Sequence, residues 1–126
     1  MQIVKQVILV ALGGGLGSAF RFLTSLLTAK YYSNAFPLAT FIANILGCFL
    51  IGLLIGILGQ NIQANQHLKL LLITGFCGGY TTFSAFASEN ISLLQSNNYL
   101  TTIIYITLSV LAGLLAVWLG LTLTKV

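Results

Sequence analysis

The chain reads Thr-Gly-Phe-Cys-Gly-Gly-Tyr-Thr-Thr-Phe-Ser-Ala-Phe over residues 74–86, and this stretch decides the fold. It lies within a long apolar segment that otherwise resembles a membrane helix, yet it holds three glycines, then two threonines and two phenylalanines. In the hydrocarbon core of a bilayer, an interrupted backbone is tolerated only where it is buried in protein or lines a water-filled path. We therefore expect a functional break in a membrane-spanning element, and such a break points to ion handling.

The composition of the whole chain supports a membrane location. Of its 126 residues, 58% are hydrophobic and 5% are charged, whereas a soluble domain carries about 25% charged residues. We expect one membrane domain over residues 1–126. The net charge of +4 comes from scattered Lys and Arg residues, so the clustered basic patch of a nucleic-acid-binding protein is missing. One histidine and one acid, with no phosphate-binding loop, leave nothing to support an enzyme.

Four stretches are long enough to cross a bilayer, which takes about 20 mostly apolar residues. The expected spans cover about residues 3–29, 38–59, 70–94 and 99–124. The first is expected to be a retained helix rather than a cleaved signal peptide, because no small-residue cleavage site follows it. Four spans place both termini on one side. The lysine distribution favours a cytoplasmic location for them by so small a margin that both orientations can insert.

Three polar residues stand out within the apolar spans: Arg21, Asn44 and Glu89. Such residues are costly in lipid and are functional candidates by default. Arg21 is either an interfacial anchor or a source of positive potential at an anion vestibule. Glu89 is either a satisfied acid near the boundary of the bilayer, or a group that gates, binds or carries protons at a channel mouth. The amide of Asn44 must bond a neighbouring helix or a passing ligand.

Aromatic and hydroxyl side chains near the expected break have a similar ambiguity. Phe83 and Phe86 share one helix face at i, i+3 spacing, which fits core packing but also a narrow path lined by electropositive ring edges. Thr82 and Ser84 add hydroxyl donors beside them.

The fourth span carries a polar line on one helical face, at Asn98, Thr102, Tyr105 and Ser109. Serine and threonine often bond their own helix backbone instead of a ligand. Because donors outnumber carboxylates, the lining suits an anion. A broken helix also leaves carbonyl oxygens free to coordinate a cation.

These features together resemble a known family, the Fluc (CrcB-type) fluoride channels of bacteria and other microbes. The resemblance covers the whole chain, and the motif at residues 75–86 with Glu89 after it is its most specific part. The other matching segments are Gly13-Gly14-Gly15-Leu16-Gly17 followed by Arg21, and Thr40-Phe41-Ile42-Ala43-Asn44-Ile45-Leu46-Gly47-Cys48.

The resemblance implies an all-α integral membrane protein with a broken third helix, paired with a second copy as an antiparallel, dual-topology homodimer. It implies a sodium ion at the dimer axis, held by the backbone carbonyls of Gly78 and Thr81. The matching pathway positions are Asn44, Phe83, Phe86, Tyr105 and Ser109, with Thr82 and Ser84 beside them, and the vestibule positions are Arg21 and Glu89.

The function that the resemblance implies is passive, selective export of cytoplasmic fluoride across the cell (inner) membrane. One alternative is a proton-coupled exporter of cationic drugs, like the small multidrug transporters. Those proteins place their essential acid in the first span, whereas the only acid of this chain is Glu89 in the third. A second alternative is a membrane assembly subunit that transports nothing, which would not need polar residues along two spans.

Overall fold

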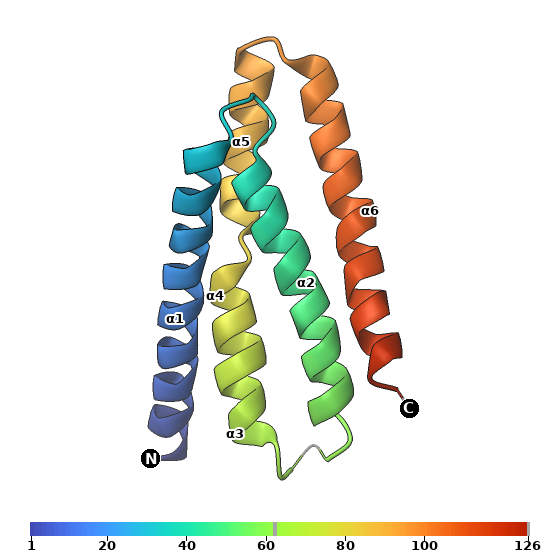
Figure 1. Cartoon of the computed structure of the whole chain (residues 1–126). Helices are drawn as coiled ribbons and strands as arrows, with labels where there is room; N and C mark the ends of the chain where they lie inside the picture. Colours follow the sequence, from blue (N-terminus) through green and yellow to red (C-terminus); the bar gives the residue numbers. More distant parts are fainter. Residues whose placement is uncertain (62, 126) are drawn as a thin grey trace.

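The structure is a computed structural model that describes residues 1–61 and 63–125, and within these ranges it is entirely helical (Figure 1). The helices follow one another as α1 (Gln2–Tyr31), α2 (Leu38–Leu58), α3 (Gln66–Leu68), the π-helix η1 (Lys69–Cys77), α4 (Gly78–Tyr80), α5 (Phe83–Gln95) and α6 (Tyr99–Leu123). Both ends of the chain lie at the same end of the bundle, beside the connection between α2 and α3 (Figure 1).

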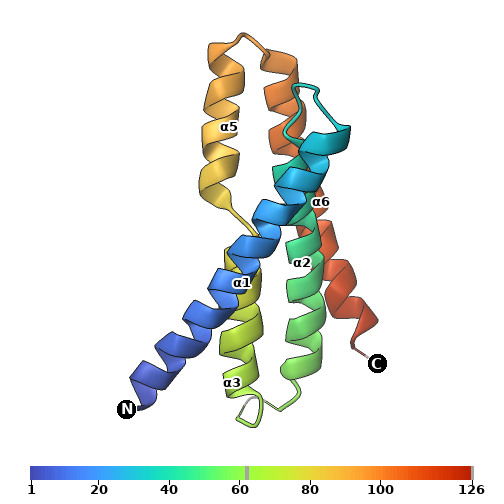
Figure 2. The same ribbon diagram turned by 60° about the vertical axis from the view of Figure 1, so that its left-hand side comes forward.

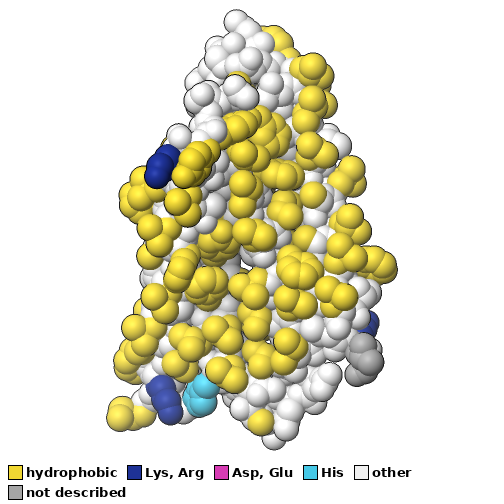
Figure 3. All heavy atoms as spheres, viewed as in Figure 1, with side chains coloured by type: hydrophobic (Ala, Val, Ile, Leu, Met, Phe, Trp, Pro, Cys, Tyr) yellow, Lys and Arg dark blue, Asp and Glu magenta, His cyan; other side chains and the backbone are white. Residues whose placement is uncertain are grey.

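Four helical segments are long and apolar enough to cross a membrane, as the hydropathy of the sequence predicted. They are Gln2–Tyr31, Leu38–Leu58, Gln66–Gln95 and Tyr99–Leu123. Few of their side chains are buried inside the chain: Leu114 of α6, for example, is 68% exposed. Hydrophobic side chains cover much of the face seen in Figure 3, with Lys and Arg near its edges. Such a surface requires lipid or another apolar partner.

The third span changes direction at two residues. α4 ends at Tyr80, and Thr81 and Thr82 have extended backbone (φ −86°, ψ 158° and φ −151°, ψ 120°) before α5 begins at Phe83. Figure 2 shows α5 displaced from the axis of the preceding half. The glycines of residues 74–86 do not form this interruption themselves, because they lie in helical backbone and none has a positive φ.

Two of those glycines, Gly75 and Gly79, instead allow α1 to touch the third span. A Cβ on Gly17 would overlap the carbonyl oxygen of Phe76 and lie 2.8 Å from the amide nitrogen of Tyr80, and a Cβ on Gly79 would overlap the carbonyl of Gly14. Backbone-to-backbone contact of this kind is how helices pack where lipid removes the hydrophobic drive.

A second glycine contact joins α2 to α6. A Cβ on Gly52 would overlap the carbonyl oxygen of Val117, and Gly120 faces Phe49 and Leu53 in the same way. The chain therefore consists of two closely packed pairs, α1 with the third span and α2 with α6. The contacts of Asn44 and Glu89 described next join the two pairs.

Candidate functional site

The interruption at Thr81 and Thr82 is stabilised by side chains that replace the missing helical hydrogen bonds. In a continuous helix the amide of Thr82 would donate to the carbonyl of Gly78, four residues earlier. It donates instead to Oδ1 of Asn44 at 2.7 Å, while Nδ2 of Asn44 donates to the carbonyl of Thr82 at 3.1 Å. Of the two roles expected for Asn44, the structure gives it the bond to a neighbouring segment.

The start of α5 is capped within the same segment. Thr82 is the N-cap residue, and its Oγ1 accepts a hydrogen bond from the amide of Ala85 at 3.2 Å. This is the usual side-chain cap of a helix N-terminus. It also means that the Ala85 amide does not donate to the carbonyl of Thr81, as it would in a continuous helix. Ser84 lies next to the cap, with its Oγ 3.3 Å from that of Thr82.

The carbonyl groups of Gly78 and Thr81 are two of those that lose their helical donors at the interruption. They are the two groups expected to hold a cation. Gly78 is exposed on this chain, and the nearest atom to a Cβ built there is 4.0 Å away. Carbonyl oxygens are ligands for hard cations, and the described residues contain no cluster of three or more His, Cys, Asp or Glu side chains. The residues present therefore fit a sodium ion held by backbone oxygens.

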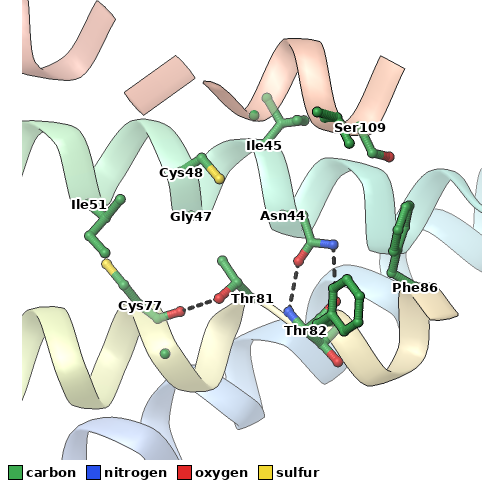
Figure 4. Close-up of a pocket in the computed structure, with 14 residues that line it drawn as sticks. Asn44, Ile45, Gly47, Cys48, Ile51, Cys77, Thr81, Thr82, Phe86 and Ser109 are labelled. Atoms are coloured by element: carbon green, nitrogen blue, oxygen red, sulfur yellow. Dashed lines mark hydrogen bonds between the residues drawn. The ribbon is translucent and has the colours of Figure 1, made fainter. Parts of the chain in front are cut away.

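A cavity of about 360 Å³ lies beside the interruption, between α2, the third span and α6 (Figure 4). We call it the break cavity. Its lining residues are Asn44, Ile45, Gly47, Cys48, Ile51, Cys77, Gly78, Thr81, Thr82, Phe83, Phe86, Ser109, Val110 and Gly113. It brings together five of the expected pathway residues, which are Asn44, Thr82, Phe83, Phe86 and Ser109. Tyr105 and Ser84 are not among its lining residues.

The two phenylalanines have different environments. The centroids of the Phe83 and Phe86 rings are 5.9 Å apart. Phe86 packs edge-on against Tyr105, with a centroid distance of 4.9 Å. Phe83 is 78% exposed on the single chain, which is unusual for a side chain that also lines a cavity. Core packing therefore accounts for Phe86 but not for Phe83.

Glu89 forms the most polar contact inside the bundle. Its Oε1 accepts a hydrogen bond from the hydroxyl of Tyr105 at 2.7 Å, and its Oε2 accepts one from Oγ1 of Thr40 at 2.6 Å. Tyr105 is completely buried. Thus both carboxylate oxygens have donors from neighbouring helices, and the Tyr105 hydroxyl is engaged with Glu89 in this structure.

The hydroxyl of Ser109 differs from that of Tyr105 in its hydrogen bonding. Ser109 lines the break cavity, and its Oγ is buried and has no hydrogen-bond partner among the described residues. A buried polar group without a partner costs free energy, and it calls for a ligand or water in the cavity. Ser109 is therefore a pathway candidate whose hydroxyl is not already bonded to another described residue.

Arg21 and Glu89, the expected vestibule residues, border a second cavity of about 350 Å³ between α1, α2 and α5. We call it the vestibule cavity. Thr40 and Ser18 also line it. Nε of Arg21 donates to the carbonyl of Gly79 at 3.2 Å, so this side chain is anchored to the third span.

Two polar residues were missed by sequence reasoning. Thr40 is a partner of Glu89, and its position four residues before Asn44, on the same face of α2, could have indicated it. Asn90 is 93% buried, and its Nδ2 donates to the carbonyl of Phe86 while its Oδ1 has no partner among the described residues. No signal in the sequence distinguishes Asn90 from a solvated residue at the end of the span.

Comparison with known proteins identifies the family. Residues 8–121 match the family model described as CrcB-like protein, Camphor Resistance (CrcB). The chain belongs to the CrcB-like family. A relative from Flavobacterium psychrophilum, named fluoride-specific ion channel FluC, is 55% identical over 122 residues, which are 97% of this chain and 98% of that protein.

Two further relatives carry the same name. The protein from Azobacteroides pseudotrichonymphae is 47% identical over 122 residues, 97% of this chain and 98% of its own length. That from Gloeothece citriformis is 46% identical over 120 residues, 95% of this chain and 97% of its own length. With four apolar helices that can span a bilayer, this CrcB-family chain is a multi-pass protein of the cell membrane.

Proposed function

We propose that this protein is a fluoride-selective passive channel that lets cytoplasmic fluoride leave the cell down its electrochemical gradient. The observation that carries the proposal is the break cavity. It joins the unpartnered hydroxyl of Ser109 to the Asn44 amide and to two phenylalanines, and its described lining residues include no Asp or Glu. Relatives named as fluoride channels over nearly the full length support the same assignment.

The chemistry of the lining suits a small, strongly hydrated anion. A selective path must replace the water around the ion with close donors, yet bind weakly enough to release it. One hydroxyl without a partner among the described residues, the Asn44 amide bonded to the backbone of Thr82, and aromatic ring edges provide dipoles and quadrupoles instead of a full positive charge. In the proposed channel, a narrow path beside Phe83 and Phe86 would exclude larger halides.

The functional unit that we propose is an antiparallel homodimer with two fluoride paths. Phe83 is exposed although it lines the break cavity, and Gly78 is also exposed on the single chain. Apolar surfaces on α1 and α6 provide area for both lipid and a second copy. In this assembly the interrupted third spans of the two copies meet, and the break becomes a shared element rather than a local irregularity.

The carbonyls of Gly78 and Thr81 would hold sodium between the two copies. When bound, the ion would supply the positive charge that attracts the freed carbonyl oxygens. The chain's own contribution is to keep those oxygens free, because Asn44 and Thr82 take up the amides that would otherwise occupy them. Exchanging sodium for a bulky organic cation is expected to lower fluoride flux while chain folding, followed by circular dichroism, is retained.

Fluoride efflux from liposomes tests the function. Purified protein is reconstituted, the vesicles are loaded with fluoride or chloride, and release is followed with ion-selective electrodes. Fluoride release without comparable chloride release is expected. Lack of fluoride release, or equal release of both anions, would contradict the proposal, and proton-driven uptake of a cationic dye would support the multidrug alternative instead. The sole acid argues against that alternative, because both of its oxygens already have donors.

A further inference from the structure

We propose that Arg21 is a positioning residue that holds the interrupted third span open through its Nε donor. This role differs from supplying positive potential to an anion, which its place in the vestibule cavity suggests. Only the fluoride-flux readout of this inference rests on the proposed function. Its structural part concerns the hydrogen bonds of the third span and can be measured separately.

Arg21 replaces a hydrogen-bond donor that the third span loses at its interruption. In a continuous helix the carbonyl of Gly79 would accept from the amide of Phe83, four residues later. Thr81 and Thr82 are extended, so the chain no longer brings that amide back to Gly79. The Nε of Arg21 donates to this carbonyl at 3.2 Å. It therefore replaces the lost donor, as Asn44 replaces the acceptor that the Thr82 amide has lost.

The spacing of residues along α1 places Arg21 next to this carbonyl. Gly13, Gly17 and Arg21 are four residues apart and lie on one face of α1. The two glycines press the α1 backbone against the third span, where a Cβ on either would overlap a carbonyl oxygen. The next position on that face is Arg21, at the level where α4 ends. The same face of α1 therefore provides both the close packing against the third span and the donor to the Gly79 carbonyl.

The hydrogen bond from Arg21 to the Gly79 carbonyl has a charged donor. A hydrogen bond from a charged donor contributes more than one between neutral groups, and Arg21 is only partly exposed. Asn44 and Arg21 approach the interruption from α2 and α1, on two different sides. Losing either donor set leaves the segment from Gly79 to Phe83 less constrained, so that its amides open more often and Phe83 moves relative to the break cavity.

Two substitutions separate the donor from the charge. In Arg21→Gln the amide nitrogen is attached to Cδ, as Nε is in arginine, so a donor stays in place while the charge is lost. In Arg21→Lys a methylene group takes the place of Nε, so the charge is kept one bond further out and the donor is lost at that position. Ser18→Ala is the matched control, because Ser18 lines the same cavity and makes none of the contacts that hold the interruption.

The experiment measures amide hydrogen exchange of a peptide covering residues 77–86, in lipid nanodiscs, together with fluoride efflux. We expect Arg21→Gln and Ser18→Ala to exchange as the parent protein does. Arg21→Lys is expected to exchange about tenfold faster, the effect of losing one hydrogen bond to a charged group, and to conduct fluoride more slowly. If Arg21→Lys exchanges like the parent, or Arg21→Gln exchanges as fast as Arg21→Lys, the positioning role is wrong.

A third variant covers failure of Arg21→Lys to fold. Arg21→Met matches the side-chain length of Arg21→Gln without a donor or a charge, so the two variants differ chiefly in the donor. Faster exchange in Arg21→Met than in Arg21→Gln supports the proposal, and equal exchange overturns it. Loss of fluoride flux in the parent protein would refute the channel function but would leave the exchange result, and hence the role of Arg21, unaffected.

Discussion

The two halves of the third span, on either side of Thr81 and Thr82, differ in what they present to their neighbours. The half from Gln66 to Tyr80 contacts α1 through glycines and buries backbone against backbone. The half from Phe83 to Gln95 presents aromatic and polar side chains, and Glu89 is bonded to both α2 and α6. The lack of a side chain at the glycines therefore determines how the first half packs, whereas the chemistry of the side chains determines the site in the second half.

The largest expected effect follows from adding a methyl group to the glycine-packed half. In Gly17→Ala the new Cβ would overlap the carbonyl of Phe76, and neither backbone can move away cheaply. We expect a loss of about 3 kcal/mol in the free energy of unfolding, at the upper end of overpacking effects. Unfolding of purified protein in mixed micelles measures it.

Gly15→Ala is the control for this substitution. No atom lies within 4 Å of a Cβ at Gly15, and alanine favours a helix over glycine by about 1 kcal/mol. Unchanged or increased stability is therefore expected. Equal destabilisation by both substitutions would mean that helix contact does not explain the glycines of α1.

At the junction of the two halves, Asn44→Asp is expected to reduce fluoride flux by about tenfold or more. The aspartate can still accept from the Thr82 amide, but it cannot donate to the Thr82 carbonyl, and it adds a negative charge to the break cavity. One lost hydrogen bond and anion repulsion each correspond to about a factor of ten. Efflux from proteoliposomes measures the effect, and parent-like flux would remove Asn44 from the pathway.

In the polar half, Tyr105→Phe is expected to lower stability by about 2 kcal/mol, because it leaves Oε1 of Glu89 without its donor. Tyr99→Phe is the control, since the Tyr99 hydroxyl bonds Asn97 at an exposed position. Thermal unfolding compares the two variants. Equal melting temperatures would indicate that the Glu89 contact contributes nothing to stability.

The smallest effect on stability is expected for Ser109→Ala, which removes a hydroxyl with no partner among the described residues. Stability should change by less than about 1 kcal/mol, because no protein hydrogen bond is lost. Fluoride flux should nevertheless fall several-fold if the hydroxyl serves the ion. A large loss of stability with normal flux would reverse this assignment and make Ser109 a packing residue.

The sequence was sufficient to predict an all-helical chain with four membrane spans, because hydropathy alone determines which segments can lie in lipid. It was less informative about contacts between spans. That Asn44 bonds Thr82, that Thr40 joins Glu89 and that Arg21 reaches Gly79 depend on how each helix is rotated, which spacing along one helix does not give. The extended residues are the threonines rather than the glycines, and two of the glycines, Gly75 and Gly79, lie in helical backbone packed against α1.

Voltage-driven fluoride efflux tests the central claim most directly. Proteoliposomes loaded with potassium fluoride are diluted into potassium-free, sodium-containing buffer, and valinomycin sets a negative interior at equal pH on both sides. We predict rapid fluoride release that starts with valinomycin, needs no pH gradient and greatly exceeds chloride release from matched vesicles. Release that requires a proton gradient, or chloride release at the same rate, would contradict a passive fluoride channel.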